Sequence, residues 1–77
     1  MSGQIRLRYT YHARVRMSER DISEQEVREV LAHPDSTGKG MGDALVCKKV
    51  VRGRRLTVVY RGLSSDYNLI ITVYQEG

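Results

Sequence analysis

Three residues near the start of the chain, His12, Arg16 and Arg20, recur at every fourth position. On an α-helix this spacing places an imidazole ring and two guanidinium groups on one stripe. Histidine exchanges protons near neutral pH, and the planar fork of arginine matches the oxygens of a phosphate. The stripe therefore predicts either a site that handles a phosphate group or a helix face whose charges are only solvated.

A structural interpretation of the stripe stays open beside the functional one. Ala13 and Met17 lie four residues apart and would form the buried seam of the same helix. His12 would then border this seam, half-buried and hydrogen-bonded to the backbone or to a neighbouring side chain. The two arginines of the stripe would be tethered to acids of the next helix, such as Glu24 and Glu26.

Charge is unevenly distributed along the 77 residues. The net charge is +4, but residues 1–20 carry five Arg against one Glu, and residues 37–55 carry six cations against one Asp. Between these basic blocks, residues 21–36 carry five acids against one Arg. If the fold brings the two basic blocks together, they form a patch suited to a polyanion. The alternative is that the charges are scattered over the surface and serve only solubility.

The first half of the chain predicts one short strand and two helices. Residues 5–9 alternate apolar and basic side chains, as an edge strand does. Thr10 is a suitable N-cap for a first helix that runs to about residue 19. Ser23 and Glu26 have the spacing of a capping box, which predicts a second helix that ends near residue 33, just before a proline.

The second half predicts a loop and three strands. Residues 34–43 contain three alternating glycines and are interpreted as a flexible loop. The strands span residues 44–51, 56–61 and 67–74, and the short turns between them favour an antiparallel meander. We therefore expect a two-layer α+β fold of order β-α-α-β-β-β, with both N-terminal helices packed on an antiparallel sheet. The whole chain, residues 1–77, is expected to be one domain.

Composition argues against several classes of site and location. Cys47 is the only cysteine and lies in an apolar run, so we expect a buried structural thiol rather than a reactive one. No cluster of Cys and His has the spacing of metal ligands, and we expect neither a metal nor a cofactor. No apolar run approaches the roughly 20 residues of a membrane helix, and the start of the chain lacks a signal-peptide pattern. We therefore expect a cytoplasmic protein.

Three stretches of the sequence resemble a known family. They read H-A-R-V-R-M-S-E-R-D-I-S-E-Q-E-V from residue 12, R-R-L-T-V-V-Y from residue 54 and I-I-T-V-Y from residue 70. Over residues 5–75 the chain resembles the domain-of-unknown-function family 4258. This family is usually grouped with the RelE/ParE-like toxins of bacterial toxin–antitoxin systems, and the grouping implies a RelE-like fold.

The resemblance implies two kinds of activity. RelE-like toxins cleave mRNA on the ribosome without a metal ion, whereas ParE-like toxins inhibit DNA gyrase. Metal-free cleavage requires a base for the 2′-hydroxyl proton, cations for the phosphate charge, and an acid for the leaving 5′-oxygen. We expect a metal-independent endoribonuclease toxin that acts on RNA or at the ribosome and pairs with an acidic antitoxin. The alternative is a non-enzymatic member that binds nucleic acid or inhibits a protein, as ParE-like toxins do.

The candidate site residues fall into two sets. We expect His12, Arg16 and Tyr74 to be catalytic, the last because the resemblance implies a functional tyrosine near the C-terminus. The resemblance also implies basic residues on the strands, and the nucleic-acid-binding candidates are Arg20, Lys48, Lys49, Arg54 and Arg55. Lys48 and Lys49 are adjacent in an expected strand and point to opposite faces of it, so at most one of them can join a single site.

Overall fold

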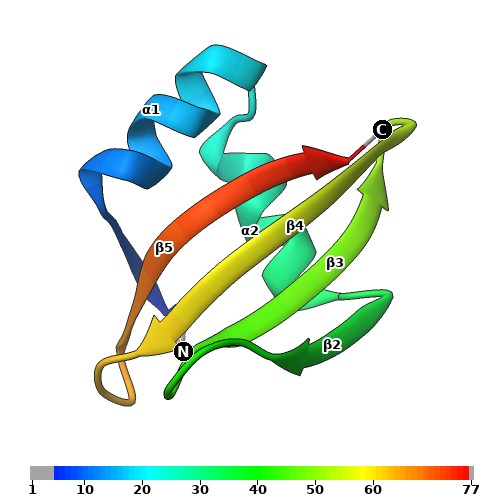
Figure 1. Ribbon diagram of the computed structural model, residues 1–77. Coiled ribbons are helices and arrows are strands. Elements are labelled where there is room, and N and C mark those ends of the chain that lie inside the picture. Colours follow the sequence, from blue (N-terminus) through cyan, green and yellow to red (C-terminus); the bar gives the residue numbers. More distant parts are fainter. Residues whose placement is uncertain (1–4, 77) are drawn as a thin grey trace.

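The computed structural model describes residues 5–76 (Figure 1). In this part of the chain one short strand precedes two helices, and four further strands follow them. The bounds are β1 Arg6–Tyr9, α1 Tyr11–Arg20, α2 Glu24–Ala32, β2 Ser36–Lys39, β3 Leu45–Val51, β4 Arg54–Gly62 and β5 Tyr67–Glu76. The α+β class and the order of the predicted elements are confirmed, and β2 is an addition to them.

Both helices begin at the caps predicted from the sequence. The Thr10 hydroxyl accepts a hydrogen bond of 3.0 Å from the N–H of Ala13 and so caps α1. At α2 the Ser23 hydroxyl accepts from the N–H of Glu26, and the Glu26 carboxylate accepts from the N–H of Ser23, which completes the capping box. Within residues 5–76, neither helix has the length and apolar character needed to cross a membrane.

The five strands form one sheet in the order β1-β5-β4-β3-β2. The pairs β2–β3, β3–β4 and β4–β5 are antiparallel, as short turns dictate. β1 pairs with β5 in parallel, so the sheet is mixed, and the prediction of an antiparallel sheet is wrong at this edge. The physical reason is that no hairpin joins β1 to β5: the chain passes through both helices and three strands before it returns to this edge.

Residues 36–39, which lie in the predicted loop, form the edge strand β2. Ser36 pairs with Lys48 and Lys39 with Leu45 of β3. Gly and Ser have a weak preference for strands, which is why the sequence pattern pointed to a loop. The pairing is reinforced by Asp35, whose N–H donates to the Lys48 carbonyl and whose carboxylate accepts from the N–H of Val50. Backbone hydrogen bonds to β3 therefore outweigh the weak local propensity.

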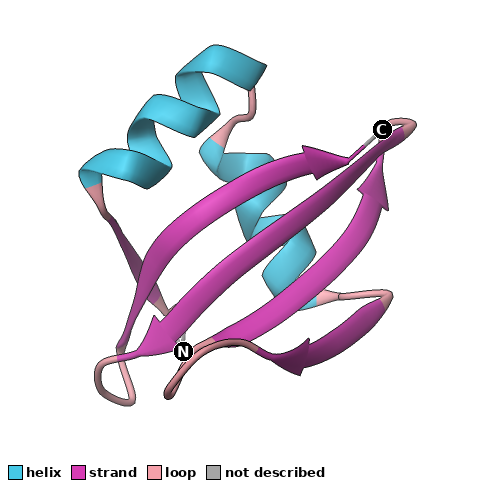
Figure 2. Ribbon diagram, in the orientation of Figure 1, coloured by secondary structure: helices cyan, strands magenta, loops and turns pink. Residues whose placement is uncertain are grey.

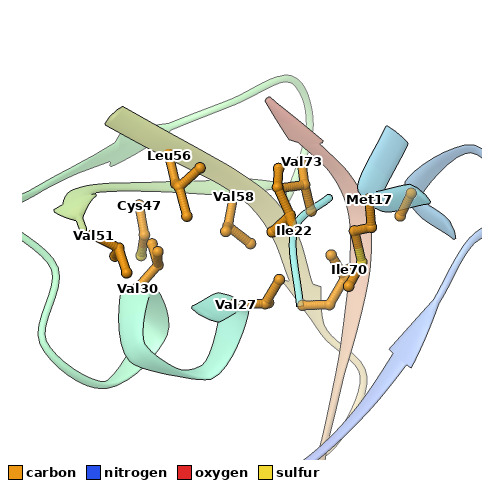
Figure 3. Close-up of a cluster of buried hydrophobic side chains, with 11 residues drawn as sticks. Met17, Ile22, Val27, Val30, Cys47, Val51, Leu56, Val58, Ile70 and Val73 are labelled. Atoms are coloured by element: carbon orange, nitrogen blue, oxygen red, sulfur yellow. The ribbon is translucent and has the colours of Figure 1, made fainter. Parts of the chain in front are cut away.

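Both helices pack on the same face of the sheet; in Figure 2, α2 passes behind the strands and α1 lies beside β5. α1 packs along β5, and α2 packs across β3 and β4. Between the two layers lies a cluster of buried side chains, shown in Figure 3. Its members are Ala13, Met17, Ile22, Val27, Val30, Cys47, Val51, Leu56, Val58, Ile70 and Val73. The two-layer packing is thus confirmed, and the opposite face of the sheet has no helix over it in the described part of the chain.

Candidate nucleic-acid interface

The face of the sheet that the helices do not cover is called the open face. Side chains along a strand alternate between the two faces of a sheet. Cys47 and Val51 of β3 are buried beneath the helices, so Lys48 projects from the open face. On β4 the core residues alternate with Arg55 and Thr57, which therefore project from the open face as well.

Three residues of the open face lie side by side across neighbouring strands. The register pairs Lys48 of β3 with Thr57 of β4, and Thr57 with Tyr74 of β5. Tyr74 is 44% exposed, whereas Thr57, which lies between Lys48 and Tyr74, is 5% exposed. The fold therefore brings the predicted C-terminal tyrosine and one predicted lysine into one row.

A carboxylate joins this row. Oε2 of Glu76 lies 3.5 Å from Nζ of Lys48 and accepts a hydrogen bond of 3.3 Å from the hydroxyl of Thr57. Arg55 stands opposite Glu76 in the register and adds a guanidinium group. We call Lys48, Arg55, Thr57, Tyr74 and Glu76 the open-face cluster. It combines a carboxylate that can accept a proton, a phenol that can donate one, and two cations that suit a phosphate.

The charge of the open face is strongly positive. Leu7 and Tyr9 of β1 pack against the core, so the arginines that alternate with them point the other way. Arg8 pairs with Leu69 of β5, and Leu69 pairs with Arg61 of β4, which places both guanidiniums on this face. The cations on the strands of this face are Arg6, Arg8, Lys48, Arg55 and Arg61, and the carboxylate among them is Glu76. Such a surface favours a polyanion.

The structural interpretation of the helical stripe is wrong on two points. His12 is exposed, so it is not a half-buried packing residue. Arg16 lies 3.9 Å from Glu19 of its own helix rather than against an acid of α2. The acids of α2 pair instead with other arginines, namely Arg14, Arg52 and Arg54.

α1 runs beside β5, along the stretch that β1 does not reach (Figure 1). At one end the Thr10 hydroxyl donates a hydrogen bond of 2.7 Å to the carbonyl of Ile71. At the other end Arg54 donates both to the carbonyl of Arg20 and to the side chain of Gln75. These two attachments align α1 with the second half of β5, the strand that carries Tyr74.

The stripe lies on the flank of α1 that is turned away from α2. Nη1 of Arg14 lies 3.0 Å from Oε2 of Glu24, so the Arg14 flank faces the start of α2. Residues two apart on a helix differ by roughly 200° around its axis, which puts His12 and Arg16 on the opposite flank. This flank and Tyr74 therefore belong to neighbouring elements at one edge of the sheet.

Two of the predicted nucleic-acid-binding residues lie on the helix-covered face. Nζ of Lys49 is 3.6 Å from Oδ1 of Asp35, and Arg54 is bonded to Glu26. The expectation that Lys48 and Lys49 project from opposite faces is confirmed, because Lys48 reaches Glu76 on the open face whereas Lys49 lines a hollow with Glu29 of α2. We therefore leave Lys49 and Arg54 out of the candidate interface.

Arg54 and Glu26 form a partly buried ion pair that joins three elements. Both carboxylate oxygens of Glu26 lie 2.8 Å from Nη2 of Arg54, and the Glu26 side chain is 5% exposed. The hydrogen bond from the N–H of Ser23 and, after it, those from Arg54 hold the pKa of Glu26 below its ordinary value of 4.5, against the opposing effect of burial. Arg54 also donates to the carbonyls of Arg20 and Asp21. Its guanidinium thus connects β4 to the end of α1 and to α2.

Cys47 has the environment of a structural thiol, as predicted. It is buried in the core, and burial raises the pKa of the thiol above its ordinary value of 9.0. Because the thiolate is the reactive form, this residue is a poor nucleophile. Within residues 5–76, no three or more His, Cys, Asp or Glu side chains come together in a group that could hold a metal ion.

Sequence reasoning missed two members of the open-face cluster, Thr57 and Glu76. Glu76 could have been found, because it follows Tyr74 by two positions and the strand period puts both on one face. Thr57 could not, because its place between Lys48 and Tyr74 depends on the register of three strands. A threonine inside an apolar strand carries no functional signal of its own.

Most of the chain matches the model of one protein family. Residues 9–75 match the family described as Domain of unknown function (DUF4258). The chain belongs to the DUF4258 family. No curated protein and no solved structure matches the chain. The segment shared with DUF4258 includes His12, Lys48 and Tyr74, and Glu76 follows it directly.

Proposed function

We propose that this DUF4258 protein is a toxin-like endoribonuclease of the RelE type, which cuts RNA at the open-face cluster without a metal ion. One observation carries the proposal: the Glu76 carboxylate is held 3.5 Å from the Lys48 ammonium, on the face that also presents Tyr74. A proton acceptor, a cation and a proton donor are the groups that metal-free cleavage requires. The usual grouping of the DUF4258 family with toxins that include the RNA-cleaving RelE type supports the same reaction.

In the proposed reaction, a 2′-hydroxyl of the RNA attacks the adjacent phosphorus. Glu76 accepts the hydroxyl proton as the O2′–P bond forms, and Lys48 and Arg55 stabilise the added negative charge on the phosphate oxygens. Tyr74 gives its proton to the 5′-oxygen as the P–O5′ bond breaks. The products are a 2′,3′-cyclic phosphate and a 5′-hydroxyl end, and proton exchange with water restores Glu76 and Tyr74.

His12 and Arg16 take a different part in this scheme from the one their sequence pattern suggested. Glu76 replaces His12 as the proposed base, because Glu76 shares a strand face with Tyr74 whereas His12 stands on α1. We assign His12, Arg16 and Arg20 to binding RNA phosphates from the edge of the sheet. Arginine forks match phosphate oxygens, and an exposed imidazole can donate a hydrogen bond to them.

The proposed partner of the toxin is an acidic antitoxin, and the proposed location is the cytoplasm, where RNA and ribosomes are. The positive open face supports such a partner, because an acidic segment bound there would neutralise its cations and cover the open-face cluster. Binding of the antitoxin and of RNA would then exclude each other.

The chemical form of the product ends tests the proposed reaction. The purified protein is incubated with a single-stranded RNA, in EDTA without ribosomes and in magnesium with them, and the new ends are identified. Attack by a 2′-hydroxyl yields 2′,3′-cyclic phosphate and 5′-hydroxyl ends in at least one of the two conditions. Ends with a 5′-phosphate would contradict the proposed attack, since they come from attack by water. Steeply salt-dependent binding without any cleavage would favour the non-enzymatic alternative instead.

A further inference from the structure

A second cationic group lies on the open face, away from the residues assigned to cleavage. It consists of Arg6 and Arg8 of β1, Tyr67 and Leu69 of β5, and Arg61 of β4, and we call it the distal cluster. The register places Arg8, Leu69 and Arg61 in one row across three strands, and it pairs Arg6 with Tyr67. The pattern repeats that of the open-face cluster, in which cations and a tyrosine also share neighbouring strands.

The Tyr67 ring is flanked by two guanidinium groups. Cζ of Arg6 lies 5.8 Å and Cζ of Arg8 lies 5.5 Å from the ring centroid. Nη1 of Arg6 also donates a hydrogen bond of 3.2 Å to the Tyr67 hydroxyl. Contacts of this kind hold the long arginine side chains near the ring, which reduces the entropy they lose when a ligand binds.

The charges of the distal cluster are not neutralised within the described part of the molecule. Between residues 5 and 76, no carboxylate lies within ion-pair distance of Arg6, Arg8 or Arg61. Other arginines do have such partners, as Arg14 does in Glu24 and Arg54 does in Glu26. The three guanidiniums of the distal cluster are therefore available to an external anion.

The two clusters are separated along β5 by a strip without charge. Tyr67 and Tyr74 are seven positions apart, roughly 23 Å at a rise of about 3.3 Å per residue. A β-bulge between them, where Val59 pairs with Thr72 but Tyr60 pairs with Ile70, keeps both rings on the open face. Between them lie Val59 and Thr72, which face each other across β4 and β5. Thr72 is 6% exposed, and its buried hydroxyl has no hydrogen-bond partner in the described residues. An extended ligand can follow β5 from one cluster to the other.

We propose that the distal cluster is a second RNA subsite, which binds the single strand at a distance from the bond that is cut. Arg8 and Arg61 contact phosphates, and a base stacks on Tyr67 or on the guanidinium planes beside it. The inference rests on the proposed function in taking the open face as the RNA surface. Aromatic and guanidinium planes together favour nucleobases, whereas an acidic protein segment would need the cations alone.

Binding of an RNA that cannot be cut tests this subsite apart from cleavage. A fluorescent 12-nucleotide 2′-O-methyl oligouridylate lacks the attacking hydroxyl, and its affinity is measured by fluorescence anisotropy over a range of salt concentrations. The variants are Arg8→Ala with Arg61→Ala, and separately Tyr67→Leu. The matched control is Lys39→Ala with Lys49→Ala, which removes the same charge from the helix-covered side, since Lys39 pairs with Leu45 and so lies on the same face as Cys47. Circular dichroism shows that each variant is folded.

The proposal gives a distinct result for each variant. Removal of Arg8 and Arg61 weakens binding at least tenfold and lowers the slope of log affinity against log salt by about 1.4, as expected for two phosphate contacts on a single strand. Tyr67→Leu weakens binding at least fivefold with the slope unchanged, since about that much is lost with one stacked base. The lysine control binds as the parent does.

Three outcomes would overturn the proposal. The first is equal binding by the arginine variant and its lysine control. The second is unchanged binding by Tyr67→Leu. The third is tight binding of an oligoglutamate peptide of the same charge that Tyr67→Leu weakens as much as it weakens RNA binding, which would show that the ring does not select nucleobases. Failure of the proposed function would give a different result: RNA is not cut, but the variants still bind it as predicted. If RNA is cut but the distal variants have an unchanged KM, the nuclease stands and the subsite fails.

Discussion

The ammonium of Lys48 lies 3.5 Å from a carboxylate oxygen of Glu76, although these residues are 28 positions apart in the sequence. The contact joins β3 to the end of β5 on the open face. The same carboxylate oxygen accepts a hydrogen bond from the Thr57 hydroxyl of β4. The position of Glu76 is therefore fixed by contacts from both β3 and β4. The proposed catalytic base is thus held in place by the sheet itself.

Glu76→Gln should separate cleavage from binding. The amide keeps the shape of the side chain but cannot accept the 2′-hydroxyl proton, so we expect the cleavage rate to fall by about 100-fold or more. RNA binding should stay the same or tighten, because a negative charge leaves the open face. Initial rates and anisotropy measure the two effects. A variant that cuts at the parent rate would remove Glu76 from the mechanism, and a larger loss in His12→Ala would return the role of base to His12.

Lys48 and Lys49 form a matched pair of adjacent cations on opposite faces. Lys48→Ala should weaken RNA binding and reduce the salt slope by about 1, as loss of one phosphate contact does. Lys49→Ala should leave both quantities unchanged, because its ammonium lies beside Asp35 on the helix-covered face. Equal effects of the two substitutions would show that overall charge, rather than the open face, governs binding.

Arg54 and Arg55 form a second matched pair, this time for stability. Arg54→Ala removes the guanidinium nitrogen that donates to both oxygens of the buried Glu26 carboxylate and leaves it the hydrogen bonds from Ser23 and Arg52, so we expect the free energy of unfolding to fall by about 2 kcal/mol. Arg55→Ala removes an exposed side chain, and we expect a change within about 0.5 kcal/mol, together with weaker RNA binding. Urea unfolding compares the two variants. Similar stabilities would mean that the Arg54–Glu26 pair contributes little to the fold.

The lowered pKa of Glu26 makes stability depend on pH in a defined direction. The carboxyl takes up a proton near 4.5 in the unfolded chain and only at lower pH in the folded protein. Its contribution is therefore complete above 4.5 and is lost as the pH falls through the folded value. Glu26→Gln should flatten this part of the urea-stability profile, whereas Glu24→Gln, at an exposed site, should leave it intact. A parent profile that is flat between pH 5 and pH 3 would contradict the assignment.

Features set by neighbouring residues could be predicted from the sequence. The caps at Thr10 and Ser23 are examples, because each depends on residues three positions apart. The opposite orientations of Lys48 and Lys49 follow from the period of a strand in the same way. These interactions need no knowledge of the rest of the fold.

Features set by distant residues could not be predicted. The parallel pairing of β1 with β5 joins segments about 61 positions apart, and no local pattern encodes its direction. Arg54 is hydrogen-bonded to Glu26, which lies 28 positions away in α2. The sequence alone therefore could not show that Arg54 forms an ion pair within the protein. The open-face cluster is hidden for the same reason, since valines occupy both faces of β3 and β4 and do not tell which face the helices cover.

The most direct test of the proposed nuclease is induced expression in bacteria with mapping of 5′-hydroxyl RNA ends. The parent protein should arrest growth and generate new 5′-hydroxyl ends, and Lys49→Ala should do the same. Lys48→Ala and Tyr74→Phe should give few such ends and restore growth while the proteins remain folded. The account is contradicted if the parent produces no new 5′-hydroxyl ends, or if Lys48→Ala and Tyr74→Phe produce as many as the parent.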